Sequence, residues 1–414
     1  MNKHVPWVTE FHRVPNRMKV LQLIRSEGPV SRAEIARRLD LSRPTASRII
    51  DALMREGIIA CVGKSQPTGG RLGDLYTFRI DAGVVLGLQL GTRQARAAVA
   101  TLNGEILHRT SRPLALEKRQ SVLPQLRAFI EDTLNASPQK AVTVLAVGLA
   151  VPGVVNRDEG TVKYPAGPFP GLTDRPLLRE LEQHLGVPVV MDNDVNFAAL
   201  GECQSGCAQG HRGVAYIFVG PGIGAGLILN GQLLRGSSGA AGEIGYMVVD
   251  RANLRRSFEP LGCLESVAGI HHLAQAAKRR GLPYDTPDAV CEHAMAGDPQ
   301  ACAIIQELNE YLAAATINTV TVIDPEIVVL GGDLADLPYA EALFVQPIEA
   351  IVRRHVVGAP LVRLSQLLGD AALHGALHAA VGLALATAGR SDGHAASVGD
   401  TSNMLAVAGN VPQD

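Results

Sequence analysis

The sequence is poor in aromatic residues and in cysteine. Phe, Trp and Tyr make up 4% of its 414 residues, with a single Trp, and the six cysteines are scattered along the chain. This spacing excludes a small secreted scaffold held by disulfides, so we expect reduced thiols. The longest apolar stretch, residues 141–155, is interrupted by Gly and Pro and is shorter than the roughly 20 residues that span a bilayer. With no signal peptide at the start, we expect a cytoplasmic protein without membrane contact.

The chain as a whole has no large excess of either charge, because it contains 38 Lys and Arg and 40 Asp and Glu. The two signs are unevenly distributed: residues 1–80 have a net charge of +7 and the remaining residues −9. We call these parts the head and the body. A basic head on an acidic body suggests a nucleic-acid-binding module joined to a domain with another task.

Capping signals divide the head into three helices. Apolar residues recur at helical spacing over residues 16–27 and stop at a Gly-Pro pair. Ser31 precedes Glu34 by three residues, which is the spacing of a capping box, and Ser42 with Pro44 starts a third helix that runs to Gly57. The short turn between the last two helices is typical of a helix-turn-helix.

Two predicted strands, residues 58–62 and 75–78, flank a Gly-rich loop and predict a wing. Basic surface residues are commonly only solvated, but cap, turn, basic helix and wing together favour DNA binding. In this reading, side chains of the third helix read base edges in the major groove and Arg71 enters a minor groove. The predicted DNA contacts are Ser31, Arg32, Ser42, Arg43, Pro44, Thr45, Ser47, Arg48, Lys64, Gly69, Gly70 and Arg71.

The body begins twice in the same way. Strand-like runs with an Asn-Gly turn occur at residues 84–110 and again at residues 214–235, and each is followed by alternating helical and strand patterns. This order indicates an α/β body of two similar lobes, with a cleft between them for a small ligand.

Several polar or Gly-rich segments in the body each allow two interpretations. Residues 220–226 and 328–332 have the glycines of a phosphate loop, but tight turns need the same residues. Residues 191–196 place two carboxylates and two amides where a strand passes into a helix, a common position for α/β sites. Glu243 and Glu265 each lie near glycines, although a solvated glutamate is the simpler interpretation of either alone.

Over residues 16–388 the chain resembles the ROK family of repressors and sugar kinases. The similarity rests on Gly69-Gly70-Arg71 in the head and on motifs spread along the body: Val151-Pro152-Gly153, Asp192-Asn193-Asp194-Val195-Asn196, Gly239-Ala240-Ala241-Gly242-Glu243-Ile244-Gly245, Gly262-Cys263-Leu264-Glu265 and Gly331-Gly332. The resemblance implies an α/β chain: a winged helix-turn-helix (1–80), a two-lobed actin-like, ribonuclease H-like sugar-kinase fold (81–388) and a flexible tail (389–414).

The resemblance also implies a sugar site and the remains of a nucleotide site. The sugar would be held by Asn193, Asp194, Glu243, Tyr246 and Glu265, with Asp194 at the position of the kinase base. Vestigial nucleotide contacts would be Gly220, Gly222, Gly224, Gly331 and Gly332. However, the kinases' Asp-x-Gly-Gly-Thr reads Gln89-Leu90-Gly91-Thr92-Arg93, and Pro221 stands where they place Thr. Phosphoryl transfer depends on these groups, so we expect no enzyme activity and no cofactor.

The family's zinc ligands are also largely missing. Their positions read Tyr246, Arg256, Phe258 and Cys263, which leaves one ligand and cannot complete a tetrahedral site. We therefore expect no metal.

The resemblance implies a cytoplasmic repressor of carbohydrate-metabolism genes. As a homodimer or homotetramer it would bind double-stranded operator DNA with an inverted repeat, and a sugar or sugar derivative would be its effector. Three alternatives stay open: an active sugar kinase with a regulatory head, an orphan regulator with a vestigial cleft, and an activator.

Overall fold

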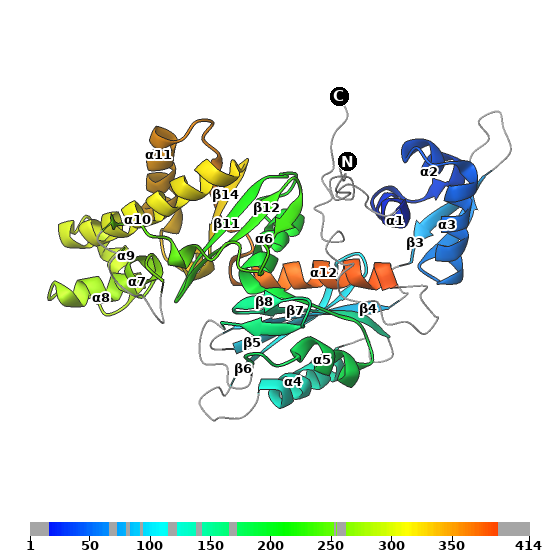
Figure 1. Ribbon diagram of the computed structural model, residues 1–414, viewed down its shortest axis with the longest axis horizontal. Helices are drawn as coiled ribbons and strands as arrows, with labels where there is room; N and C mark the ends of the chain where they lie inside the picture. Colours follow the sequence, from blue (N-terminus) through cyan, green and yellow to red (C-terminus); the bar gives the residue numbers. More distant parts are fainter. Residues whose placement is uncertain are drawn as a thin grey trace, which may run out of the picture.

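A computed structural model describes residues 16–65, 73–79, 83–91, 94–114, 122–137, 143–164, 172–251, 254 and 262–387. Figure 1 shows three parts: a small helical head, a first lobe built around one sheet, and a second lobe built around another. The long helix α12 lies on the sheet of the first lobe, and α1 of the head lies near its end.

The head is a three-helix unit with a small antiparallel sheet. Ser31 and Ser42 cap α2 and α3, each by accepting a backbone N–H three residues ahead, as the sequence predicts. Strand β3 pairs with both β1 and β2, and β2–β3 form the wing hairpin. Its elements are α1 (Asn16–Glu27), β1 (Val30–Ser31), α2 (Arg32–Arg38), α3 (Arg43–Arg55), β2 (Ile59–Lys64) and β3 (Asp74–Phe78).

Lobe one has a five-stranded sheet in the order β10-β7-β4-β5-β6. Strands β4, β5 and β6 are antiparallel, and β7 and β10 continue the sheet parallel to β4. Helices α4 and α5 cover one face and α12 the other (Figure 1). Its elements are β4 (Val84–Leu90), β5 (Gln94–Thr101), β6 (Ile106–Pro113), α4 (Val122–Ala136), β7 (Val144–Val151), β8 (Val154–Asn156), β9 (Thr161–Lys163), α5 (Leu177–Leu185) and β10 (Val189–Asn193).

Lobe two repeats this topology, with the order β13-β12-β11-β14-β15. The first three strands are again antiparallel and the last two parallel. The repeated opening in the sequence is thus a repeated sheet. The elements are β11 (Val214–Val219), β12 (Ile223–Leu229), β13 (Gln232–Leu234), α7 (Glu265–Ala268), α8 (His272–Arg279), α9 (Pro287–Met295), α10 (Pro299–Ile323), β14 (Ile327–Gly331), α11 (Gln346–His355) and β15 (Leu361–Leu364), with short helical turns at Ile244–Tyr246, Gly332–Asp336, Glu341–Val345 and Leu368–Asp370.

Two helices lie between the lobes, α6 (Asp194–Ser205) and α12 (Ala371–Thr387). Their backbones touch directly, because a Cβ on Gly201 would overlap the carbonyl oxygen of Ala371, and one on Gly375 would overlap that of Phe197. A Cβ on Gly148 of β7 would likewise overlap the carbonyl oxygen of Ala376. The small residues of α12 therefore let it approach both α6 and the lobe-one sheet closely.

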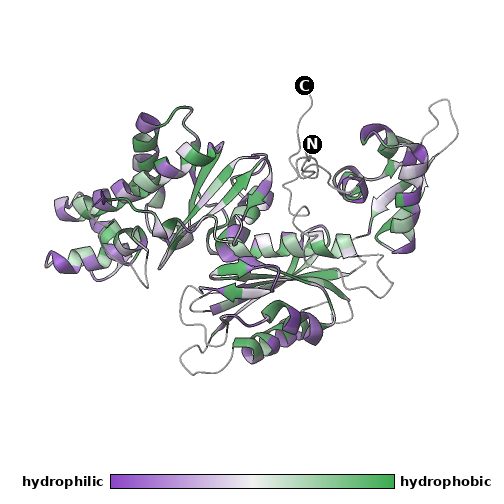
Figure 2. Ribbon diagram, viewed as in Figure 1, coloured by the Kyte–Doolittle hydropathy of each residue, from purple (hydrophilic) through white to green (hydrophobic). Residues whose placement is uncertain are grey.

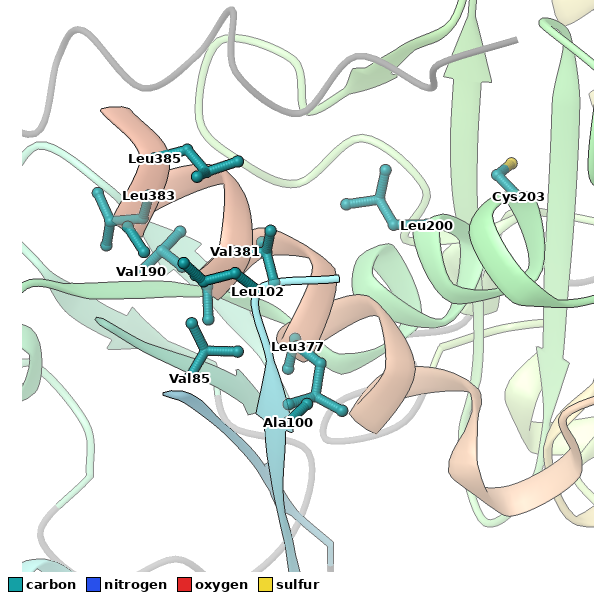
Figure 3. Close-up of a cluster of buried hydrophobic side chains, with 14 of the residues drawn as sticks. Val85, Ala100, Leu102, Val190, Leu200, Cys203, Leu377, Val381, Leu383 and Leu385 are labelled. Atoms are coloured by element: carbon teal, nitrogen blue, oxygen red, sulfur yellow. The ribbon is translucent and has the colours of Figure 1, made fainter. Parts of the chain in front are cut away.

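One continuous apolar core joins the head to the inner faces of both lobes. It includes Ile24 of α1, Leu102 after β5 and Val381 of α12, together with Tyr216 of β11. Figure 3 shows the part of this core around α12, and Figure 2 shows hydrophobic residues concentrated in the two sheets. Two further cores fill the outer faces of the lobes.

The apolar stretch 141–155 contains strand β7, and the most apolar of the described helices is α12. By length and composition alone, Leu368–Thr387 could cross a membrane, but most of it is buried inside the protein. Its apolar surface is covered by α6 and the lobe-one sheet, as in the core helix of a globular protein.

We expect Gly375→Ala to destabilise the body by about 1–3 kcal/mol, because the added methyl group would separate α12 from the backbone of α6. The measurement is the free energy of unfolding by urea titration. Gly73→Ala serves as the control, since a Cβ there meets Ser31 at an ordinary 3.7 Å. Equal stability of the two variants would contradict the close contact of α6 and α12.

Candidate functional site

The N-terminal half of α3 presents polar and basic side chains to solvent. Ser42, Arg43, Pro44 and Arg48 are exposed, while Ala46, Ile50 and Leu53 are buried on the opposite face. The hydroxyl of Ser42 caps the helix and also lies 2.7 Å from the hydroxyl of Thr45. Because α3 has no acidic residue in its first turn, its exposed end is positively charged.

Arg32 has partners inside the head. Its Nε donates to the Tyr76 hydroxyl at 2.7 Å, one Nη pairs with Asp51 at 2.6 Å and the other donates to the Ser47 carbonyl at 3.4 Å. These bonds hold the start of α2 against α3 and the wing. The DNA contact that the sequence suggests for Arg32 remains a prediction, and it would compete with this network.

Of the DNA contacts predicted in the wing, the structure describes Lys64. Lys64 ends β2 and is exposed, next to the exposed Val62. Gly69, Gly70 and Arg71 lie outside the described residues.

The body's main polar cluster lies where β10 passes into α6, at the edge of lobe one that faces lobe two. Asn193 caps α6, because its Oδ1 accepts the N–H groups of Val195 and Asn196 at 2.8 and 3.2 Å. Its Nδ2 donates to the carbonyl of Gly153 at 3.0 Å. Asn193 is thus held on both sides, and it fixes the position of the neighbouring Asp194.

Asp192 forms a buried ion pair between the lobes. Its Oδ2 lies 2.7 Å from Nε of Arg235, which follows β13 in lobe two, and its Oδ1 accepts from Asn196 at 3.0 Å. The side chains of Asp192 and Arg235 are 3% and 14% exposed. The motif at residues 191–196 is therefore largely structural, and sequence reasoning missed Arg235 because it is 43 residues away.

Three carboxylates from separate elements gather at the end of this motif, and Asp194 belongs to it. Burial and, to a smaller extent, the nearby charge of Glu243 raise the pKa of Asp194 to about 7, although backbone hydrogen bonds from Val195 and Asp194 oppose this. Burial and the charge of Glu265 raise the pKa of Glu243. Burial also raises the pKa of Glu265, although a backbone hydrogen bond from Ile223 opposes this. The structure thus brings together Asp194, Glu243 and Glu265, which are separated in sequence.

Tyr246 is exposed, unlike these buried groups. It ends the helical turn Ile244–Tyr246, and 57% of its surface is exposed. A sugar contact by Tyr246 remains a prediction that would require the ring to reach the cleft from its rim.

The glycines of the expected nucleotide rim pack against protein atoms. A Cβ on Gly220 would come within 2.7 Å of the Phe218 ring, and one on Gly332 within 2.9 Å of the same ring. A Cβ on Gly331 would overlap the Tyr216 hydroxyl. Gly224 lies against Val195, and Gly222 lies at ordinary distance from Glu265. Close packing therefore explains most of these glycines without a phosphate.

Among the residues that the structure describes, no three His, Cys, Asp or Glu side chains are grouped as a metal ion would need. Cys263 is buried and Tyr246 exposed. Of the other two positions that correspond to the family's zinc ligands, Arg256 and Phe258, the structure gives no description.

The fold and the site define a winged helix-turn-helix joined to an actin-like body of the sugar-kinase type. Comparison with family models agrees: residues 15–60 match a winged helix-turn-helix DNA-binding model, and residues 85–382 match the ROK family model. The chain belongs to the ROK family. Both expectations from the sequence, the family and the fold class, are confirmed.

Curated relatives are similar over most of the chain. The xylose repressor of Caldicellulosiruptor bescii is 27% identical over 353 residues, which is 82% of this chain and 87% of that protein. The DNA-binding transcriptional dual regulator NagC of Escherichia coli is 25% identical over 362 residues, which is 84% of this chain and 88% of NagC.

Solved structures are similar to the whole chain or to the body. A ROK family transcriptional regulator, a homologue of the Escherichia coli Mlc protein, covers 94% of this chain with a TM-score of 0.76 at 23% identity, and this chain covers 97% of it. A ROK glucokinase from Streptomyces griseus, solved with glucose and AMPPNP, covers 72% of this chain with a TM-score of 0.59 at 28% identity, and 99% of it is covered.

We expect the thermal stability of the protein to depend on the ionisation of Asp194. Its pKa is about 7 in the folded protein, against a usual value of 3.8, so the folded state binds this proton more tightly than the unfolded state. The resulting stability is complete below about pH 4 and is lost as the pH rises through 7. Asp194→Asn, which stays neutral, should therefore raise the Tm more at pH 8.5 than at pH 5.

The measurement is the Tm of the wild type and the variant at both pH values. Asp285→Asn is the control, because Asp285 is exposed. A change in Tm that is the same at both pH values for Asp194→Asn would mean that this carboxyl is not buried as described.

Proposed function

We propose that the chain is a DNA-binding repressor of carbohydrate-metabolism genes that senses a sugar in the cleft of its body. One observation carries the proposal: the same chain combines an exposed basic helix α3 with three gathered carboxylates, Asp194, Glu243 and Glu265, in a kinase-like cleft. The relatives named as repressors of xylose and N-acetylglucosamine genes support this function. A protein of this kind works in the cytoplasm, where its operator is.

The head would place α3 in the major groove. Arg43 and Arg48 are both exposed on α3 and have the length to reach phosphates or guanine edges. Lys64 and the predicted contacts Gly69, Gly70 and Arg71 would follow the neighbouring backbone and minor groove. A homodimer or homotetramer would present two heads to an inverted repeat.

The cleft would hold a sugar through charge-assisted hydrogen bonds. Sugar hydroxyls are donors, and ionised carboxylates are strong acceptors for them. The charge of Glu243 raises the pKa of Asp194, and the charge of Glu265 raises that of Glu243, so hydroxyl donors would relieve an unfavourable cluster of charge. Asn193 would position Asp194, while Tyr246 would contact the sugar from the rim.

Catalysis is not part of the proposal. Pro221 replaces a hydroxyl donor and has no N–H, and Phe218 fills the space between Gly220 and Gly332. Gln89, at the position of the kinase Asp, is the penultimate residue of β4, and its Oε1 is buried and unpartnered among the described residues. An unpartnered acceptor is unfavourable beside a phosphate, which needs donors and positive charge.

We expect Arg48→Ala to weaken binding to the DNA upstream of the protein's own gene by about 1–3 kcal/mol, because the variant loses a contact from the groove-facing side of α3. Binding is measured by fluorescence anisotropy at fixed salt. Arg55→Ala is the matched control, since it removes the same charge from an exposed site in the last turn of α3. Equal weakening by both variants would show a general charge effect and contradict the assigned docking.

The sugar assignment is tested by calorimetric titration with D-xylose, N-acetyl-D-glucosamine, D-glucose and their phosphates. We expect one of them to bind and to change DNA affinity, and Glu243→Gln to weaken that binding at least tenfold because a charged acceptor is lost. Binding of none would favour an orphan regulator with a vestigial cleft. ATP turnover that depends on the sugar and is abolished by Asp194→Asn would instead favour an active kinase.

A further inference from the structure

Helix α1 of the head rests on two elements of lobe one. Arg25, in its last turn, donates from Nη2 to the carbonyl of Asn103 at 3.2 Å, in the turn that joins β5 to β6. The same Nη2 lies near Gly104, where an added Cβ would come within 3.9 Å. The second element is α12, against which α1 packs within one continuous apolar core.

The contact with α12 includes His378. Burial and the charge of Arg25 lower the pKa of His378 to about 4, so the imidazole is neutral at physiological pH. Burial also lowers the pKa of Arg25. A neutral ring lets the guanidinium approach α12 without repulsion, while the Asn103 carbonyl accepts one of its N–H groups. Arg25 thus bonds to the turn after β5, while the helix that carries it packs against α12.

Helix α12 also packs directly against the helix that begins at the cleft. Asn193 and Asp194 form the start of α6, and the backbones of α6 and α12 touch at Gly201 and Gly375. Such contacts have no flexible side chains between them that could absorb a small movement. On its other side, α6 packs against β12 of lobe two, where Gly226 lies against the backbone of Val195.

We propose that α6 and α12 transmit the state of the cleft to the head, and that Arg25 is the positioning residue that receives it from α12 and the Asn103–Gly104 turn. A ligand that changes the angle between the lobes displaces α6, and α12 moves with it. Because α1 contacts both α12 and the turn, a movement of α12 relative to the turn changes the position of the head. A ligand-dependent head position would alter operator affinity. This proposal rests on the proposed function.

The first test asks whether α1 rests on the body in solution, and it needs no ligand. Hydrogen exchange is compared for full-length wild type, Arg25→Met and Lys19→Met. Methionine keeps an apolar stem, and Lys19 is an exposed residue of the same helix with the same charge. We expect amides of residues 101–106 to exchange several-fold faster in Arg25→Met only. Unchanged exchange in that variant would overturn the docking of α1.

The second test measures coupling. DNA affinity is determined with and without saturating D-xylose, N-acetyl-D-glucosamine, D-glucose or their phosphates for the same three proteins, and sugar affinity is measured without DNA. We expect Arg25→Met to bind sugar like the wild type, while the sugar-induced change in its DNA affinity falls to less than twofold. Lys19→Met should keep the full change. A wild-type response in Arg25→Met overturns the proposal.

The two tests separate the possible failures. If the DNA affinity of the wild type responds to none of these sugars and sugar phosphates, the proposed sensing function and its coupling fail together, and the exchange data still decide whether α1 docks. If Arg25→Met loses DNA binding in both conditions while its Tm is unchanged, Arg25 acts within the head alone, and the proposal fails.

Discussion

The direct contact between the backbones of α6 and α12 is the constraint on which the rest of the structure depends. It requires glycine at positions 201 and 375, since any side chain there would push the helices apart. Helix α6 begins at Asn193 and Asp194, and α12 covers the inner face of the lobe-one sheet. The three gathered carboxylates, both lobes and the position of the head are thus organised around this one helix pair.

The elements of the head could be predicted from the sequence because its signals are local. Ser31 and Ser42 cap helices within three residues of themselves, and the structure confirms both. The packing of α12 was not predictable in this way. Its surface is apolar on nearly all sides, which indicates burial, but which elements bury it depends on contacts with residues more than 100 positions away. Arg32 shows the same limit, because its partner Tyr76 lies 44 residues downstream.

The resemblance to the ROK family predicts one set of ligand-binding residues in the body. The geometry separates these residues into different groups. Asp194, Glu243 and Glu265 are brought together, as a sugar site would need. Asp192 instead pairs with Arg235 and accepts a hydrogen bond from Asn196. The glycines of the nucleotide motif are retained against Phe218 and Tyr216. Packing against the neighbouring aromatic rings is therefore enough to require glycine at these positions.

The continuous core between head and body has a consequence for how this chain diversifies. Ile24 and Arg25 of α1 contact a surface formed by α12 and the turn after β5. A recombination event that brought in a different winged helix would create a mismatched surface at this junction unless α12 and that turn were exchanged with it. New operator specificities would then arise more readily by substitutions on α3 than by exchange of whole heads.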